Sequence, residues 1–222
     1  MKRADRTQLA ILDAAEHLFS IYGPNATSMR QITSLAQVNL SAVNYHFGDK
    51  DNLVEQVFQR RLNALNDERL QLLEQYQRQA PHAALKASQV VHAFFAPLIR
   101  HAFTVDHQKQ SRQPLVEQNN SDPNGFIRIL CTDQRAGILP VFRQALLAAL
   151  PGVPEEEMVW RFHFMLGATF YALQGTSGLR QALLLPPSEK PVTMEMLEAR
   201  LMSFLLGGLR APLPEDTLTL NS

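Results

Sequence analysis

The stretch that decides the fold reads VNLSAVNYHFGDK, residues 38–50, and it directly follows the amphipathic segment 27–36. Together the two stretches predict short helices joined by a tight turn. In the second helix Val43 and Phe47 form an apolar side, whereas the other side carries small or hydrogen-bonding residues. Such a helix can pack by one face on a small domain and offer the other to a DNA groove, so the stretch indicates a helix-turn-helix.

The flanking sequence completes a three-helix domain. Apolar residues recur at helical spacing over 11–22, and Gly23-Pro24 is expected to end that first helix. Ser, Thr, Asn and Asp accept hydrogen bonds from free N–H groups at helix starts. Candidate caps of this kind precede the second, third and fourth helices, and the fourth is expected over about 50–76. The caps are Thr27 or Ser28, Asn39 and Asp49.

The remainder of the chain is also expected to be helical, and no alternating strand pattern of useful length is present. The fold class is therefore all-α. We expect a small helix-turn-helix domain over 1–50 and a larger helical domain over 51–222. Polar, proline-containing stretches at 106–125 and 186–191 predict loops. Further helices are expected near 82–105, 125–150, 155–181 and 193–210.

Composition constrains the function only loosely. The chain has 222 residues, 45% of them hydrophobic, and its 21 Lys and Arg balance 21 Asp and Glu. Within residues 1–50 five basic residues stand against four acidic ones, so charge neither supports nor excludes DNA binding. The single cysteine, Cys131, excludes an internal disulfide and is consistent with a cytoplasmic location. The uncharged stretch 162–179 contains polar residues and glycines, so we expect a buried helix and no membrane partner.

Residue types suited to DNA contacts lie along the expected second and third helices and at their ends. Asn44 can pair with an adenine edge, Arg30 can reach a phosphate or a guanine, and small Ser41 and Ala42 allow close approach. Hydroxyl and N–H groups at a helix start, together with a phenol, an imidazole and an ammonium, can hold phosphates. The complete set of candidates is Thr27, Ser28, Arg30, Asn39, Ser41, Ala42, Asn44, Tyr45, His46 and Lys50.

A plainer interpretation is a helical hairpin within a bundle, with Tyr45 and His46 as ordinary surface residues. Gln37 also departs from the motif, because it occupies the turn position where glycine, which tolerates a positive φ, is usual. The helix-turn-helix pattern by itself leaves these two interpretations open.

A family resemblance favours the DNA-binding helix-turn-helix over the plain helical hairpin. Residues 27–32 read TSMRQI and residues 45–50 read YHFGDK, and these motifs resemble those of TetR-family transcriptional regulators over roughly 6–60. A second stretch, WRFHFMLGA at 160–168, together with residues 38–48, resembles a narrower branch of fatty-acid-responsive regulators of β-oxidation. The resemblance implies a homodimer that binds a palindromic operator and whose DNA affinity is changed by a small apolar effector.

The same resemblance implies that two carboxyl-terminal helices pair with their counterparts in a second subunit. By periodicity alone both segments are merely expected to be heavily buried, since the helix beginning near 155 is apolar nearly all round. The residues assigned to this dimer interface are Trp160, Phe164, Gly167, Ala168, Tyr171, Gly175, Leu197, Leu201, Phe204, Leu205 and Gly208.

In this family the effector lies inside the larger domain. An apolar tunnel with a cationic mouth would suit a fatty acid or an acyl-CoA. The possible partners of an acidic head group are Arg100, His101, Arg128 and Arg135. Aromatic and methionine residues at helical spacing are also ordinary core residues. The lining candidates are Phe94, Phe95, Leu98, His101, Arg128, Cys131, Phe142, Phe162, Met165 and Phe170.

Rival functions have weaker support. No nucleophile elbow, glycine-rich phosphate loop or metal-ligand spacing occurs, so we expect no enzyme, no cofactor and no metal. A helical lipid-binding or drug-binding protein without specific DNA binding remains an alternative, as does a multidrug-responsive repressor of an efflux gene. Few acidic residues lie within the apolar stretches, which favours an anionic lipid over cationic drugs. The sequence leaves open the effector, the operator, and whether ligand releases or promotes DNA binding.

Overall fold

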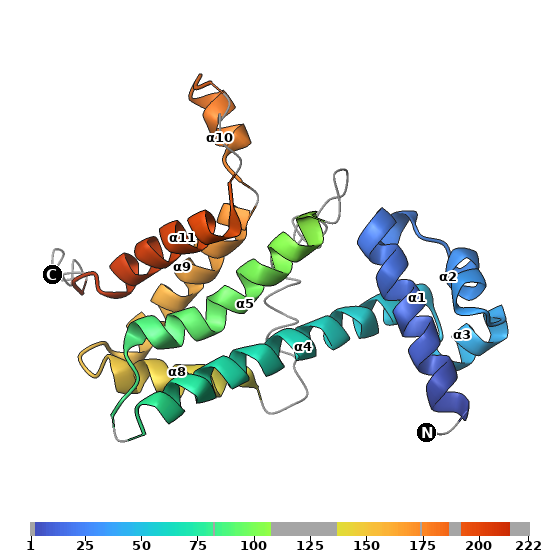
Figure 1. The fold of residues 1–222 in the computed structure, drawn as a ribbon, viewed down its shortest axis with the longest axis horizontal. Helices are drawn as coiled ribbons and strands as arrows, with labels where there is room; N and C mark the ends of the chain where they lie inside the picture. The colour runs from blue at the N-terminus through green and yellow to red at the C-terminus, as the bar shows by residue number, and fades with distance from the viewer. Residues whose placement is uncertain (1–2, 82, 108–136, 174, 187–191, 214–222) are drawn as a thin grey trace, which may run out of the picture. The chain divides into compact units, whose positions relative to one another are not determined.

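The computed structural model describes residues 3–81, 83–107, 137–173, 175–186 and 192–213, and all regular secondary structure within these ranges is helical (Figure 1). The all-α prediction is confirmed. Contacts divide the chain into two compact units, the first comprising Met1–Asp67 with His101–Ala136 and the second Glu68–Arg100 with Gly137–Ser222.

The first unit is built on three helices and the start of a fourth. They are α1 (Arg3–Ala26), α2 (Met29–Ala36), α3 (Leu40–Phe47) and α4 (Lys50–Gln79). Their shared core extends beyond the expected boundary at residue 50, because Leu53 and Val57 of α4 pack into it. The buried core residues are Ile11, Leu12, Ala14, Ala15, Leu18, Phe19, Ile32, Val43, Phe47, Leu53 and Val57.

Helix α1 is interrupted where Gly23-Pro24 predicts its end. Gly23 has φ 80° and ψ 157°, a conformation that side chains with a Cβ rarely adopt, and a last turn follows it. Thr27 closes this corner, since its hydroxyl donates to the Gly23 carbonyl oxygen at 2.7 Å. The kink thus brings the chain into α2 at an angle set by one glycine and one buried hydroxyl.

The second unit contains the end of α4, most of α5 (Ala87–His107), α8 (Ile138–Ala149), α9 (Glu155–Leu173), α10 (Ser177–Ala182) and α11 (Met194–Leu209). Helices α9 and α11 lie side by side, and α8 contacts α9 (Figure 1). None of the described helices is long and apolar enough to span a membrane.

The expected single helix over 155–181 is wrong, because the structure breaks it into α9 and α10. Gly175 takes φ 79°, and its N–H donates to the Ala172 carbonyl, so the helical pattern ends there. Residues 125–136 of the helix expected at 125–150 lie outside the described residues. Most of the two expected loops, residues 108–125 and 187–191, lies there as well.

A buried arginine joins α9 to the end of α11. The guanidinium of Arg161 donates through Nε to Glu157 Oε1 at 2.7 Å and through Nη1 to the Leu209 carbonyl oxygen at 2.6 Å. Both Arg161 and Leu209 are buried. This contact satisfies a carbonyl at the end of α11 with a charged donor, and it fixes the register of the two helices.

Candidate nucleic-acid interface

The turn between α2 and α3 has the geometry of a helix-turn-helix. Gln37 lies in the left-handed region at φ 53° and ψ 43°, as its position in the motif required. Its N–H donates to Ser34 O at 3.3 Å and that of Val38 to Thr33 O at 3.0 Å. A non-glycine residue in this region costs on the order of 1 kcal/mol, and the two hydrogen bonds and the packing of α2 and α3 offset that cost.

Side-chain caps set where the helices of this motif begin. Ser28 forms a capping box with Gln31: the Gln31 N–H donates to Ser28 Oγ at 3.3 Å, and the Ser28 N–H donates to Gln31 Oε1 at 2.7 Å. Asn39 Oδ1 accepts from the Ala42 N–H at 2.8 Å, and Asp49 Oδ1 accepts from the Asn52 N–H at 2.8 Å. The caps predicted at Ser28, Asn39 and Asp49 are therefore confirmed.

Helix α3 buries one side and exposes the other. Val43 and Phe47 are buried in the core of the unit, whereas Ser41 and Asn44 are exposed and Tyr45 is 84% exposed. The Tyr45 ring meets the ring of His46 edge-on, with the centroids 5.2 Å apart. Ala42 and His46 are half-buried at the margins of this surface. We call Ser41, Ala42, Asn44, Tyr45 and His46 the α3 face.

The other residues predicted to contact DNA differ in their exposure and in the hydrogen bonds that their side chains already make. Arg30 is exposed on α2, and Asn39 is exposed although its side chain caps α3. Lys50 begins α4 and its ammonium donates to the Asn25 carbonyl oxygen at 3.5 Å. Thr27 requires a correction: it is buried and its hydroxyl is bonded inside the α1 corner, so that hydroxyl is not presented to a phosphate.

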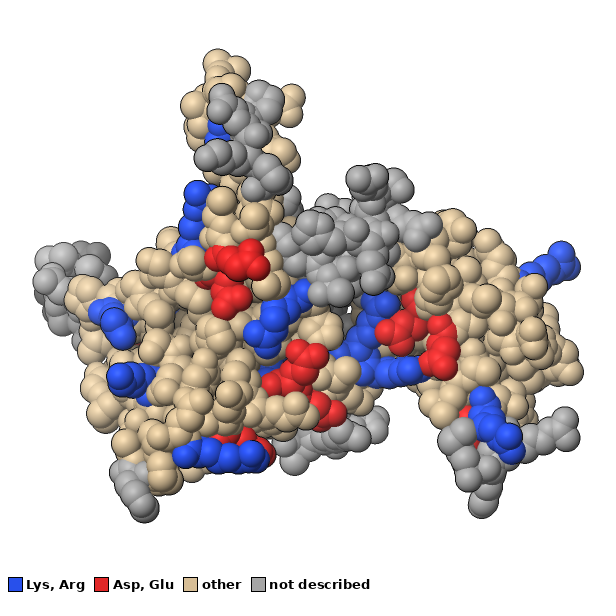
Figure 2. Space-filling view, in the orientation of Figure 1, with Lys and Arg blue, Asp and Glu red and all other residues tan. Residues whose placement is uncertain are grey.

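Positive charge in this part of the molecule is sparse, as the composition predicts. On the side of α1–α3 visible in Figure 2, the Lys and Arg side chains stand apart and form no continuous patch. Affinity for a polyanion would then depend on individually placed cations and on neutral donors, rather than on a strong field.

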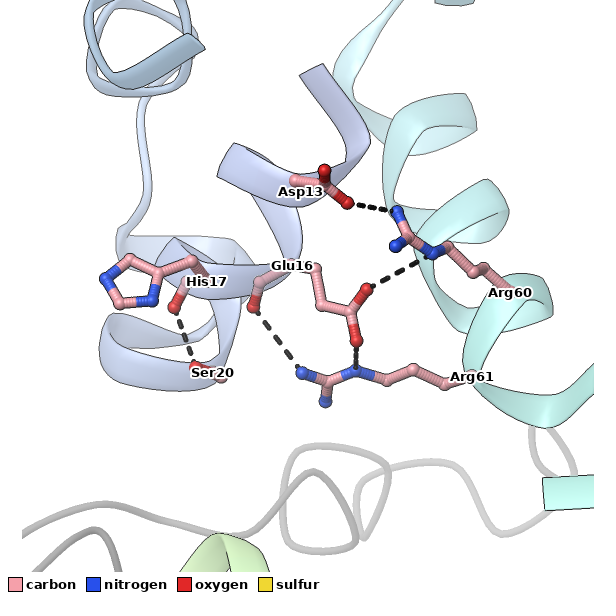
Figure 3. Close-up of polar contacts among 6 residues, drawn as sticks. All are labelled: Asp13, Glu16, His17, Ser20, Arg60 and Arg61. Atoms are coloured by element: carbon pink, nitrogen blue, oxygen red, sulfur yellow. Dashed lines mark hydrogen bonds and ion pairs between the residues drawn. The ribbon is translucent and has the colours of Figure 1, made fainter. Parts of the chain in front are cut away.

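An ion-pair network that the sequence analysis missed fastens α4 to α1 (Figure 3). Arg60 Nη1 lies 2.6 Å from Asp13 Oδ1, and Arg61 Nε lies 2.8 Å from Glu16 Oε1. Arg61 also donates to the Glu16 carbonyl oxygen at 3.5 Å. The partners are more than forty residues apart in the chain, so no local pattern could have paired them. The network joins this part of α4 to α1 in addition to the apolar packing of Leu53 and Val57 in the shared core.

The effector candidates lie mainly in the interior of the second unit. Phe94 is central, since its ring contacts those of Phe95, Phe142 and Phe162 at centroid distances of 5.0, 5.0 and 4.9 Å. Leu98 and Met165 are buried, Phe162 and Phe170 are half-buried, and His101 is exposed, so His101 is not an interior lining residue. Arg128 and Cys131 lie outside the described residues, as does Arg135.

Arg69 is a buried cation beside this aromatic cluster. Its guanidinium carbon lies 3.9 Å from the Phe94 ring centroid, and Nε donates to the Phe94 carbonyl oxygen at 2.8 Å. Burial lowers the pKa of Arg69 to about 9, which still leaves it charged at neutral pH. The sequence analysis missed it, although Arg69 continues the helical spacing of the buried residues Leu62, Leu65 and Leu73.

A second polar group that was missed links three helices of the second unit. The Tyr76 hydroxyl of α4 and His92 Nδ1 of α5 are 3.0 Å apart, and His92 Nε2 lies 3.0 Å from Glu198 Oε1 of α11. Burial, and then the Glu198 carboxylate, raise the pKa of Tyr76, against the opposing charge of Arg100. This chain of side chains couples the position of α11 to that of α4.

The proposed interface residues divide into two groups. Trp160, Phe164, Tyr171 and Phe204 are exposed, as are glycines 167, 175 and 208, while Ala168 and Leu197 are half-buried. Leu201 and Leu205 require a correction, because both are buried within their own chain, on the same side of α11 as Leu209. We call Trp160, Phe164, Gly167, Tyr171 and Phe204 the α9–α11 face. No group of three His, Cys, Asp or Glu residues with the geometry of a metal site occurs among the described residues.

Two family models match the chain, one for each region. Residues 11–57 match the family described as "Bacterial regulatory proteins, tetR family". Residues 92–208, more than half of the chain, match the family described as "Tetracyclin repressor-like, C-terminal domain". These are models of DNA-binding regulators, which agrees with the helix-turn-helix geometry of α2 and α3.

Individual relatives agree with the models. HTH-type transcriptional repressor Rv3405c of Mycobacterium tuberculosis is 53% identical over 45 residues, which cover 20% of this chain and only 24% of that protein. A TetR-family transcriptional regulator from Mesorhizobium loti is 17% identical with a TM-score of 0.55, covering 94% of this chain and 98% of its own. RolR in complex with resorcinol is 16% identical with a TM-score of 0.54, covering 96% and 97%. At these identities the two structures bear on the fold alone.

Proposed function

Because the chain belongs to the TetR family of bacterial regulatory proteins, we propose that it is a ligand-controlled transcriptional repressor that binds a palindromic operator as a homodimer. The observation that carries this proposal is the α3 face. A helix held by Val43 and Phe47 turns Ser41, Asn44 and Tyr45 outward, and these side chains supply donors and acceptors that suit a major groove.

Each side chain of the interface has a distinct role in the proposal. Asn44 pairs with an adenine edge, and the small Ser41 and Ala42 let the helix approach the base pairs. Tyr45, His46 and Lys50 hold phosphates, which fixes the register of the helix on the duplex. Arg30 holds a phosphate from the start of α2, whereas the Ser28 hydroxyl is engaged in the capping box with Gln31 and contributes indirectly by setting the first turn of that helix. Asn39 contributes indirectly, because its cap sets the first turn of α3.

Dimerisation is proposed through the α9–α11 face. Trp160, Phe164, Tyr171 and Phe204 are each more than half exposed, and large apolar side chains clustered on adjacent helices are typical of a surface that binds protein. Gly167 and Gly208 leave room for close approach of a second pair of helices. A two-fold axis between copies would present two α3 helices, which is the arrangement that a palindromic operator requires.

The proposed effector is a small apolar molecule with an acidic group, a long-chain fatty acid or its CoA ester. Its binding region would include the aromatic cluster around Phe94, where the buried cation Arg69 favours an anionic ligand. The same cation disfavours the cationic drugs of a multidrug sensor, because like charges repel strongly in a buried site. The phenylalanine cluster also favours a second candidate, an aromatic phenol of the kind that RolR binds.

Control of DNA binding is proposed to act through α4. This helix begins at Lys50 beside the α3 face, and Leu53 and Val57 pack it into the core of the DNA-binding unit, so a displacement of this part of α4 moves that unit. The effector must bind the DNA-competent and DNA-released arrangements with unequal affinity for this to work. We expect the effector to favour the released arrangement.

The test is fluorescence anisotropy of the purified protein on DNA fragments that it selects from the genome, beginning with the region upstream of its own gene. We expect affinity for the selected fragment to exceed affinity for shuffled DNA by at least about 1,000-fold, and to fall steeply with salt. Oleoyl-CoA, resorcinol and a cationic dye are then titrated separately into the complex.

The possible outcomes separate the parts of the proposal. Release by oleoyl-CoA alone supports the lipid effector, and release by resorcinol alone supports the aromatic one. Release by the cationic dye contradicts the role given to Arg69. Failure to select any fragment would contradict DNA regulation itself and favour a helical ligand-binding protein. Equal binding of oleoyl-CoA to free and DNA-bound protein would exclude it as the controlling ligand.

A further inference from the structure

An apolar side chain that none of the assigned roles explains lies at the start of α3. Leu40 is the first residue of this helix and is 48% exposed. It precedes the buried residues Val43 and Phe47 by three and seven positions, a spacing that belongs to one helix face. Because Leu40 is the first residue of α3, it lies beyond the core that covers Val43 and Phe47. Its side chain is therefore exposed beside the α3 face.

The neighbour of Leu40 on this helix is Asn44, one turn further on. Side chains four residues apart are neighbours on a helix, so Leu40, about 40° around α3 from Asn44 and on the side of the buried residues, borders the strip through which Asn44 can enter a groove. The amide of Asn44 suits the N6 and N7 atoms of adenine. A leucine offers no hydrogen bond, so its only favourable contact in a major groove is with an apolar group.

The major groove holds one such group, the C5-methyl of thymine. We infer that Leu40 reads a thymine methyl group, so that Leu40 and Asn44 together select A·T pairs at adjacent positions of each operator half-site. This inference rests on the proposed function, and it makes Leu40 a specificity-determining residue. Leu40 contributes no phosphate contact, so it affects which sequence is bound rather than the general affinity for DNA.

The structure offers a matched control on the neighbouring helix. Leu35 of α2 is 49% exposed, nearly the same as Leu40, and lies two residues before Gln37. Both residues are leucines on short helices of the same unit. General apolar contact with DNA would involve exposed leucines alike, whereas reading of a methyl group is assigned to Leu40 alone.

The experiment removes single methyl groups from the DNA. The operator is first obtained by selection from random duplexes with the wild-type protein, and each thymine is then replaced in turn by deoxyuracil, which lacks only the C5-methyl. Binding is measured by fluorescence anisotropy. We expect one position per half-site to lose about fourfold in affinity, which is about 0.8 kcal/mol for one buried methyl group, and about 15-fold when both half-sites are changed.

The variants decide which residue reads that methyl group. Leu40→Ala is expected to bind thymine and deoxyuracil operators equally, while Leu35→Ala keeps the wild-type difference. Leu40→Gln, similar in length but polar, is measured in parallel, so that a folding defect in one variant does not hide the result. Thermal unfolding of each variant gives its stability, and a merely structural role of Leu40 would leave the ratio of the two affinities unchanged.

Two results would overturn this inference and leave the proposed function intact. In the first, no position of a selected operator responds to deoxyuracil; in the second, the response persists in the Leu40 variants. An operator whose response disappears in Leu35→Ala instead would assign the reading to α2 and overturn it as well. Failure to select any operator would overturn the proposed function, and this inference with it.

Discussion

The α3 face and the α9–α11 face are both highly exposed, yet they differ in chemistry. The α3 face presents a hydroxyl, an amide, a phenol and an imidazole around one methyl group. The α9–α11 face presents indole, phenyl and phenol rings around a glycine. A DNA groove is hydrated and lined with acceptors, whereas the centre of a protein interface excludes water. The composition of the two faces, rather than their exposure, is therefore what supports proposing DNA as the partner of one and a second copy of the chain as the partner of the other.

The two units also differ in how exposed their ion-paired arginines are. In the second unit, Arg161 is buried and bonded to Glu157 and to the end of α11. In the DNA-binding unit, Arg60 and Arg61 pair with Asp13 and Glu16 where water still reaches them. A buried ion pair is costly to break and an exposed one is not, so the comparison gives predictions of very different size.

The largest effect is expected from Phe164→Glu on the α9–α11 face. In the proposed dimer interface, a carboxylate at this position would lose its hydration without gaining a partner, which costs several kcal/mol. We expect dimer affinity to fall by about 1,000-fold or more, with operator binding lost in parallel. Sedimentation equilibrium measures the change.

Val159→Glu is the matched control for that variant. Val159 is 61% exposed against 63% for Phe164, but it points about 140° away around α9. The control is expected to stay dimeric. A Phe164→Glu protein that remains a dimer would show that the interface lies elsewhere and would remove the contrast between the two faces.

Next in size is Arg161→Ala, which tests the buried network. The change leaves Glu157 and the Leu209 carbonyl without their charged donor, and we expect the free energy of unfolding to fall by about 3 kcal/mol. Urea unfolding followed by circular dichroism gives the value. Arg143→Ala removes an ion pair to Glu155 whose partners are both about half exposed, and it is expected to change stability by less than about 0.5 kcal/mol. Equal losses in the two variants would refute the distinction.

Asn44→Ala tests the α3 face and should have a smaller energetic effect. The loss of one bidentate base contact is expected to lower operator affinity by about 10- to 100-fold, corresponding to about 1.4–2.8 kcal/mol. Because Asn44 is neutral, the slope of affinity against salt should stay as in the wild type. Dimer affinity should also be unchanged. A parallel loss of dimerisation would mean that the two faces are not separate surfaces.

The smallest effect is expected from Arg60→Ala in the exposed network. Its side chain is 42% exposed, so we expect a loss of stability below about 1 kcal/mol, which disappears in 0.5 M salt. Unfolding curves at low and high salt provide the measurement. A loss near that of Arg161→Ala would indicate that the α1–α4 contact is energetically equivalent to the buried one.

Much of the DNA-binding unit could be predicted because the interactions that shape it join residues only a few positions apart in the chain. A cap bonds to N–H groups two or three residues away, a helix face repeats every three or four residues, and Gly23 interrupts α1 where it stands. Gln37 took the left-handed conformation that its position in the motif implied. The same reasoning failed at Gly175, since a long apolar pattern concealed the break that this residue makes between α9 and α10.

Other features were beyond local reasoning. Thr27, Leu201 and Leu205 were assigned to surfaces but are buried, whereas Leu40, on the apolar side of its helix, is not. The partners of Arg60 and Arg61, and the Tyr76–His92–Glu198 chain, join residues far apart in the sequence. Such contacts depend on how separate helices pack, which no short window of sequence contains.

The sequence by itself determined the helical class, the helix-turn-helix and the family, because caps, periodicity and motif residues act over a few positions of chain. Only the tertiary structure decided which leucines and aromatics remain exposed, which arginines are buried, and which helices those arginines join. The physical reason is that burial belongs to the packed assembly: a side chain loses its water only when another element, often distant in sequence, covers it.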